Sequence, residues 1–262
     1  MQDVTLPAII LLGTLITASL LVWILTGTRI WQGRSVISVA AVQLPRVHWV
    51  SAVLVLAYVT MQLLEFARDP SSDGGKVPSL ENVQTLCLFN GLLFLGLVIP
   101  LVSQEQPETA SLGFHLDHWP QQIWLGILGF FVCVAPVIAA WSTTLPWRTP
   151  TSQHGLLQLL EQDDSLLTLA WIVLAAVVLA PILEELMYRV ILQTWLQRIA
   201  PPREALIAVA VVFAAVHRLP DAVPLLPLAL ILGYLYQQTR SFLTVVVTHM
   251  LFNATNLALA VM

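Results

Sequence analysis

Charged residues are scarce in this sequence. Only 11 Lys or Arg and 15 Asp or Glu occur among 262 residues, whereas 58% of the residues are hydrophobic. Soluble domains are typically about 25% charged and about 45–50% apolar. The composition therefore excludes an ordinary soluble domain and indicates a membrane protein. Because the few cations form no basic block and no aromatic-basic patch, we expect no nucleic-acid partner.

Cysteine is also nearly absent. Cys87 and Cys133 both lie inside apolar runs and have no CxxC spacing, so we interpret them as small packing residues, not as a disulfide or metal framework. The first residues, "MQDVT", carry no positive charge, and the apolar run that follows is too long for the hydrophobic part of a signal peptide. We therefore expect that run to be retained as a membrane span.

Long apolar runs dominate what is present. Because a helix needs roughly 20 residues to cross the hydrocarbon layer, hydropathy and helix breakers predict an all-α, polytopic integral membrane bundle of about eight transmembrane helices. We expect one integral membrane domain, 1–262, with four helices in 1–165 and four in 166–262. The expected spans are 5–27, 49–67, 82–103, 121–142, 166–198, 203–218, 222–238 and 241–261.

An even number of spans places both termini on one side of the membrane. The distribution of Lys and Arg, six on one face and four on the other, weakly favours both termini outside. We expect a multi-pass integral membrane protein, located in the cell membrane if the source is prokaryotic. The lipid bilayer is thus an expected partner.

The stretch "PILEELMYR", 181–189, places two carboxylates and an arginine inside the fifth apolar run. An ionisable group at the centre of a span costs at least about 2.5–3.5 kcal/mol, so it tends to be paired and to face the interior of the bundle. Glu185 and Arg189 are spaced i,i+4 and can pair on one helical face, which leaves Glu184 without a local partner. Pro181 removes a helical hydrogen bond just before Glu184.

The later spans carry three polar residues at a similar depth. Glu184 and His217 are symmetric about the turn "APPR", 200–203, so each lies roughly 20 Å from it at 1.5 Å per residue. His249 and Asn253, counted from the next turn on the same face, lie about 12–20 Å deep by the same rise. The spacing therefore predicts that four polar side chains from three helices share one layer.

The chemistry that these groups allow is hydrolysis. A buried carboxylate can act as general base, and a neighbouring imidazole can hold or share the proton of the attacked water, which suits Glu184 with His217. A second imidazole and an amide can donate hydrogen bonds to the oxyanion of a tetrahedral intermediate, which suits His249 with Asn253.

The ordered motifs resemble a known family, the CPBP intramembrane proteases, which include the CaaX-processing endopeptidases and bacteriocin-related Abi proteins. Its pattern of Glu-Glu-x-x-x-Arg, then Phe-x-x-x-His, then His-x-x-x-Asn occurs here as "EELMYR" (184–189), "FAAVH" (213–217) and "HMLFN" (249–253). The resemblance spans roughly residues 166–256. It implies that 166–262 forms a CPBP-like catalytic core that cleaves a membrane-associated protein or peptide.

The resemblance also implies a role for each motif residue. Glu184 would activate water with His217 as partner, and His249 with Asn253 would stabilise the transition state. Glu185 and Arg189 would support these residues structurally, and Phe213 would pack beside the site. We assign no metal and favour a metal-free reaction, although Glu184, His217 and His249 are residue types that could bind Zn²⁺.

Two other classes of function remain open. A proton-coupled transporter also uses Glu, His and Arg inside the membrane, and a family member could instead act without proteolysis as an immunity protein or a scaffold. Other intramembrane proteases fit less well, because the sequence has no HExxH helix, no GxSG-like serine loop and no GxGD motif.

Overall fold

The computed structural model describes residues 5–37, 44–68, 77–103, 112–148 and 155–262. Within these ranges the chain is helical and contains no strand. The N-terminal helices are α1 (Leu6–Trp31), α2 (Trp49–Arg68), α3 (Leu80–Val102), α4 (Trp119–Thr144) with the 3₁₀ turn η1 (Leu145–Trp147), and α5 (Gly155–Gln162). The later ones are α6 (Leu166–Ile172), η3 (Val173–Leu179), α7 (Ala180–Glu185), η4 (Leu186–Gln193), α8 (Thr194–Leu196), α9 (Pro202–Val216), α10 (Ala222–Thr239) and α11 (Phe242–Val261).

The predicted fold class, a polytopic helical membrane bundle, is confirmed. Helices occupy all eight of the expected positions, and α5 is an additional short helix. Within the described residues, five helical segments are long and apolar enough to cross a membrane: α1, α3, α4 with η1, α6 to α8 as one segment, and α11. The helices α2, α9 and α10 are not among these five, and the expected division at residue 165 stays a prediction.

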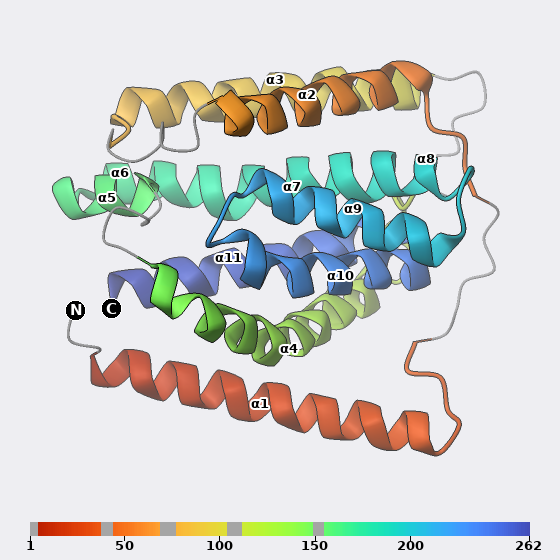
Figure 1. Ribbon diagram of the computed structural model, residues 1–262, viewed down its shortest axis with the longest axis horizontal. Coiled ribbons are helices and arrows are strands. Elements are labelled where there is room, and N and C mark those ends of the chain that lie inside the picture. The colour runs from red at the N-terminus through yellow and green to blue at the C-terminus, as the bar shows by residue number, and fades with distance from the viewer. Residues whose placement is uncertain (1–4, 38–43, 69–76, 104–111, 149–154) are drawn as a thin grey trace.

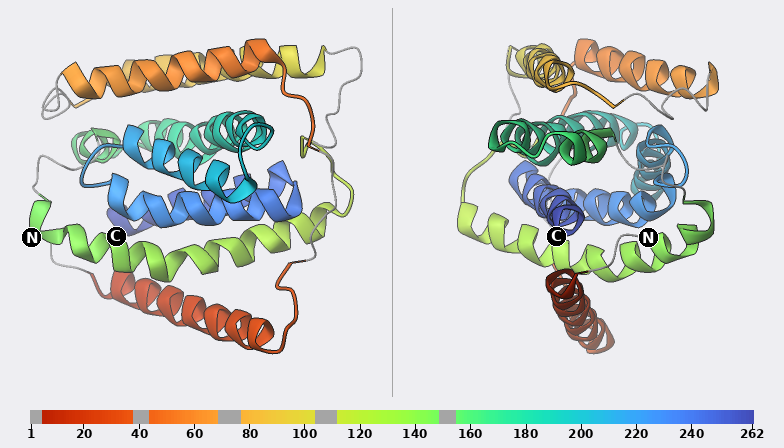
Figure 2. Two further views of the ribbon diagram at one scale, coloured as in Figure 1. Left: turned by 45° about the vertical axis from the view of Figure 1, so that its right-hand side comes forward. Right: turned by 90° about the vertical axis from the view of Figure 1, so that its left-hand side faces the viewer.

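The helices pack in layers (Figure 1). α1 is outermost and packs on α4; α10 and α11 lie on the other side of α4, followed by the segment α6–α8 with α9, and then by α2 and α3. Figure 2 shows the same order from two further directions. The start of α1 and the end of α11 lie at the same end of the bundle (Figure 1).

Several helix ends are set by short polar side chains. Ser79 and Asn82 form a reciprocal capping box at the start of α3, and the Ser241 side chain accepts a hydrogen bond from the Thr244 N–H at the start of α11. Such caps satisfy backbone N–H groups that have no partner within the helix. The Ser241 cap fixes where α11 begins, and therefore the height of the His249 side chain on that helix.

Glycines allow α4 to approach α11 and α10 closely. A Cβ atom on Gly129 would lie 2.5 Å from Leu235 Cδ1 and 2.7 Å from Thr248 Oγ1, and one on Gly126 would lie 2.9 Å from the Thr244 carbonyl oxygen. At this contact the Thr248 hydroxyl donates to the Gly126 carbonyl at 2.9 Å. Small residues and hydroxyl bonds of this kind hold membrane helices together, and here they fix the helix that carries His249.

Candidate active site

The carboxylates lie in a helix that changes its winding on both sides of them. The segment from α6 to α8 is continuous, but η3 and η4 are π-helical and flank the six-residue α7, which ends at Glu185. Pro181 is the second residue of α7, directly after the first π segment. Wide turns of this kind are rare and occur frequently at functional sites.

Glu184 faces two imidazoles from two other helices. Its Oε1 lies 4.0 Å from His217 Nε2, and its Oε2 lies 3.7 Å from His249 Nε2. The Glu184 and His217 side chains are 23% and 30% exposed, whereas that of His249 is 3% exposed. Because both separations exceed a direct hydrogen bond, they suit groups that share a small polar molecule, such as a water, between them. The structure thus brings together three of the four expected layer residues.

The ring of His217 is oriented by its own helix. His217 is the C-terminal cap of α9, and its Nδ1 lies 2.7 Å from the carbonyl oxygen of Phe213. A carbonyl only accepts, so Nδ1 carries the proton, and the Nε2 of the neutral ring presents its lone pair toward Glu184. In the neutral ring, Nε2 is therefore the nitrogen that can accept a proton.

Glu185, Arg189 and His249 form a second cluster, which is buried. The Nδ1 of His249 donates to Oε1 of Glu185 at 2.8 Å, and Nε of Arg189 lies 3.2 Å from Oε2 of the same carboxylate. The side chains of Glu185 and Arg189 have no exposed surface. The expected i,i+4 ion pair is therefore present, and its carboxylate also orients the second imidazole.

Phe213 separates the polar groups. Its ring lies 4.7 Å from the His217 ring, 6.0 Å from the His249 ring and 5.1 Å from the Tyr188 ring, measured between centroids. The guanidinium carbon of Arg189 lies 4.9 Å from the same centroid. The ring thus packs against both imidazoles and covers a buried cation, an arrangement that adds a cation–π attraction.

Asn253 lies apart from the carboxylate. Its Nδ2 donates to the carbonyl oxygen of Ala176 at 2.8 Å, in the π-helical segment before Glu184. Asn253 is one turn beyond His249 on α11, so both side chains extend toward the segment α6–α8. The other Nδ2 proton stays available to a second acceptor. The structure therefore gives Asn253 a first partner that spacing alone does not indicate.

Sequence reasoning missed the contribution of α2. Tyr58 on this helix lies within electrostatic range of Glu184, and its hydroxyl oxygen accepts a hydrogen bond from Gln62 Nε2 at 3.3 Å. The available signal was the i,i+4 pair of polar residues inside an otherwise apolar span. α2 packs on both η4 and α9, so it is a neighbour of the site that the motifs do not reveal.

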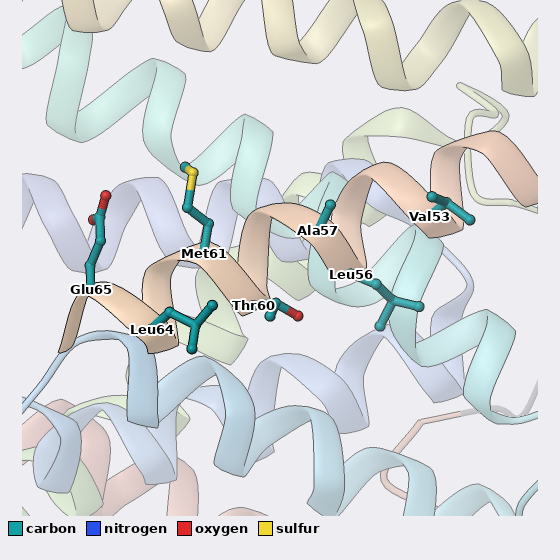
Figure 3. Close-up of a pocket in the computed structure, with 7 residues that line it drawn as sticks. All are labelled: Val53, Leu56, Ala57, Thr60, Met61, Leu64 and Glu65. Carbon is teal, nitrogen blue, oxygen red and sulfur yellow. The ribbon is translucent and has the colours of Figure 1, made fainter. Parts of the chain in front are cut away.

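The outward face of α2 carries a shallow open groove (Figure 3). Residues at helical spacing line it: Val53, Leu56, Ala57, Thr60, Met61, Leu64 and Glu65. None of them belongs to the cluster around Glu184. A mainly apolar face of this kind suits contact with lipid, and we assign it no chemical role.

The loop after His217 is fastened to the end of α4. Arg148 Nη2 and Asp221 Oδ1 form an ion pair at 2.8 Å, with side chains 22% and 40% exposed. Arg148 also donates from Nε to the Thr144 hydroxyl at 2.9 Å. This contact joins the residue before α10 to the segment that follows α4 and η1.

The residue types around Glu184 suit zinc, but their present positions do not form a metal site. Within the described part of the chain, no three His, Cys, Asp or Glu side chains converge as metal ligands would. Two zinc ligands at about 2.0–2.1 Å in tetrahedral geometry lie roughly 3.3 Å apart, which is closer than the 3.7 and 4.0 Å separations here. We derive no step that passes through a metal.

Comparison with known proteins agrees with the motif pattern. Residues 166–255 match the family model "Type II CAAX prenyl endopeptidase Rce1-like". No curated protein and no solved structure matches the chain. The matched residues run from the start of α6 into α11 and include every motif side chain described above. The match over residues 166–255, about a third of the chain, supports assignment of this region to the CPBP/CAAX protease family, whose members are integral membrane proteins.

Proposed function

We propose that this protein is an intramembrane endopeptidase that hydrolyses a peptide bond of a membrane-associated protein or peptide with water activated by Glu184. The observation that carries the proposal is the position of the Glu184 carboxylate between the Nε2 atoms of His217 and His249. The match to a peptidase family supports the reaction class.

In the first step Glu184 accepts a proton from a water molecule, while the oxygen of that water attacks the carbonyl carbon of the peptide bond. His217 can hydrogen-bond the same water through Nε2, because its proton is on Nδ1. A tetrahedral intermediate with a negatively charged oxygen results. General base catalysis by a positioned group typically contributes about 10²–10⁴-fold to the rate.

We propose that His249 stabilises that oxyanion. Its Nδ1–H donates to Glu185. The Nε2 atom can therefore act as a donor only when the ring is doubly protonated. Carboxylates lie at both ring nitrogens, with Glu184 at Nε2 and Glu185 at Nδ1. The second Nδ2 proton of Asn253 is the further donor that we propose for the oxyanion.

In the last step the intermediate collapses and the carbon–nitrogen bond breaks. The proton that Glu184 took from water passes to the leaving nitrogen, so the products are a carboxylic acid and an amine, which exchange a proton to become a carboxylate and an ammonium ion, and the enzyme returns to its starting state. No covalent enzyme intermediate is needed. Glu185, Arg189 and Phe213 act by holding the imidazoles in place.

The test is cleavage of a membrane-associated peptide by the purified protein in lipid vesicles, with Glu184→Ala and His217→Ala as variants. The proposal predicts that both variants lose cleavage while they keep the unfolding temperature of the wild type within a few degrees. Wild-type rates in either variant would contradict it. Solute flux in the same vesicles without any cleavage would instead identify a transporter, and protection against a toxic peptide that survives Glu184→Ala would identify a non-proteolytic task.

A further inference from the structure

Two prolines in helices of this bundle each leave a backbone carbonyl without its helical N–H donor. In both cases a side chain from a neighbouring helix donates a hydrogen bond to that carbonyl. Pro136 lies inside α4 and has no N–H, so the Val132 carbonyl one turn earlier lacks its regular α-helical donor. The indole Nε1 of Trp23 on α1 donates to that carbonyl at 3.1 Å. This first example joins α1 to α4, neither of which carries a motif residue, and serves as an internal reference.

The second example lies two turns before Glu184. The Ala180 N–H donates to the Ala175 carbonyl, five residues back, which is the π-helical pattern. The next bond in that pattern would run from residue 181 to the Ala176 carbonyl, but residue 181 is proline. The Ala176 carbonyl therefore has neither backbone donor: the Ala180 N–H bonds Ala175 instead, and Pro181 has no N–H. The Nδ2 of Asn253 donates to this carbonyl at 2.8 Å.

This bond is one of two that fix α11 against the catalytic segment. Four residues before Asn253, the Nδ1 of His249 donates to Glu185 at 2.8 Å. The two attachment points, Ala176 and Glu185, lie on either side of Glu184 in the sequence. Together they set the height of α11, which determines the 3.7 Å separation between His249 Nε2 and Glu184 Oε2.

We propose that Pro181 and Asn253 form a positioning pair, in which the proline frees the Ala176 carbonyl and the Asn253 amide binds it to hold His249 against Glu184. Asn253 then acts on the reaction through His249, in addition to any donation to the substrate. The structural half of the inference is independent of activity. Its catalytic half rests on the proposed function.

A double-mutant cycle tests the structural half by thermal unfolding in one detergent, with Pro181→Ala, Asn253→Ala and the combined variant. Alanine at 181 restores an N–H, so the Ala176 carbonyl regains a backbone donor from residue 181 in π-helical winding or from residue 180 in α-helical winding. Asn253→Ala should therefore lower the unfolding temperature clearly in the wild type, and by less than half as much in the Pro181→Ala background. Equal decreases in both backgrounds would overturn the pairing.

The catalytic half is tested with kcat and KM of the same four proteins. Because misplacement of a reacting group by about 1 Å can cost about 100-fold, we expect Asn253→Ala to lower kcat by about 10- to 100-fold with little change in KM. Pro181→Ala should recover the part of that loss that comes from a misplaced His249, while the part that comes from the missing oxyanion donor remains. An equal loss of kcat in both backgrounds would overturn the positioning role. If the wild type cleaves nothing, the proposed function fails, while the unfolding cycle still decides the pairing.

Two further variants keep the test decisive. If Asn253→Ala does not fold, Asn253→Asp replaces it, since an ionised carboxylate has similar size and no donor. If only the combined variant folds, that rescue supports the pairing. The matched control is Trp23→Phe with Pro136→Ala, which should show the same coupling in unfolding temperature without a change in kcat.

Discussion

Glu185 holds the His249 ring by its Nδ1 at 2.8 Å, while the neighbouring Glu184 lies 3.7 Å from the Nε2 of the same ring. Two adjacent carboxylates therefore face opposite edges of one imidazole. Glu185 is buried and paired with Arg189, whereas Glu184 is partly exposed and lies between the Nε2 atoms of two imidazoles. This difference in surroundings gives the two carboxylates different tasks.

Replacing only one residue of the Glu185–Arg189 pair should destabilise the protein more than replacing both. Because loss of one partner leaves the other charge buried and uncompensated, Glu185→Leu or Arg189→Met should each destabilise the protein by about 3–5 kcal/mol. The combined variant should recover a large part of that loss, since apolar residues can replace a buried pair. Unfolding of the three variants in detergent checks this. A combined loss equal to the sum of the single losses would show that the residues act separately.

The close approach of α4 to α11 predicts a steric effect. Gly129→Ala places a methyl group 2.5 Å from Leu235 Cδ1, and overpacking of this kind costs about 1–3 kcal/mol. Because the displaced helix carries His249, the cleavage rate should fall with the unfolding temperature. Gly96→Ala is the matched control, because nothing lies within 4 Å of its added Cβ. If the control and Gly129→Ala unfold at equal temperatures, the described packing is wrong.

The Arg148–Asp221 pair should contribute little, because both side chains are partly exposed. Such pairs are worth about 0.2–1 kcal/mol and weaken as salt screens them. Asp221→Asn should therefore lower the unfolding temperature slightly at low ionic strength and have no effect in about 1 M salt, where the Debye length is about 3 Å. The comparison is made at two salt concentrations. A large decrease that salt does not alter would indicate a structural role beyond the ion pair.

We expect the reaction to proceed without a bound metal, as interpreted from the sequence. Purified active protein should then contain far less than one equivalent of zinc by elemental analysis, and a chelator should not change the cleavage rate. Loss of activity on chelation, restored by Zn²⁺ in the wild type but not in His217→Ala, would contradict this prediction and would assign His217 as a ligand.

The sequence predicted the helices well because apolar length and breakers dominate a membrane chain. The expected span 203–218 corresponds to α9, Pro202–Val216, and 241–261 to α11, Phe242–Val261. The common depth of Glu184, His217 and His249 was also predictable, since symmetry about a turn fixes height in antiparallel helices. In the structure the Glu184 carboxylate lies 4.0 Å from His217 Nε2 and 3.7 Å from His249 Nε2, and the catalytic roles of these residues stay predictions.

Other features could not be predicted because they depend on contacts between distant segments. Hydropathy does not distinguish α-helical from π-helical winding, so η3 and η4 were not expected. The bond from Asn253 to Ala176 requires both that winding and the approach of α11. Tyr58 was missed for the same reason, since only the packing of α2 brings it near Glu184.

The most direct measurement is the cleavage rate of Glu184→Gln beside that of Glu185→Gln, with Glu204→Gln on the exposed start of α9 as control. The account predicts that Glu184→Gln loses about 10²–10⁴-fold in kcat at unchanged stability, that Glu185→Gln loses both activity and stability, and that the control matches the wild type. A Glu184→Gln protein that cleaves peptide at the wild-type rate would contradict the account.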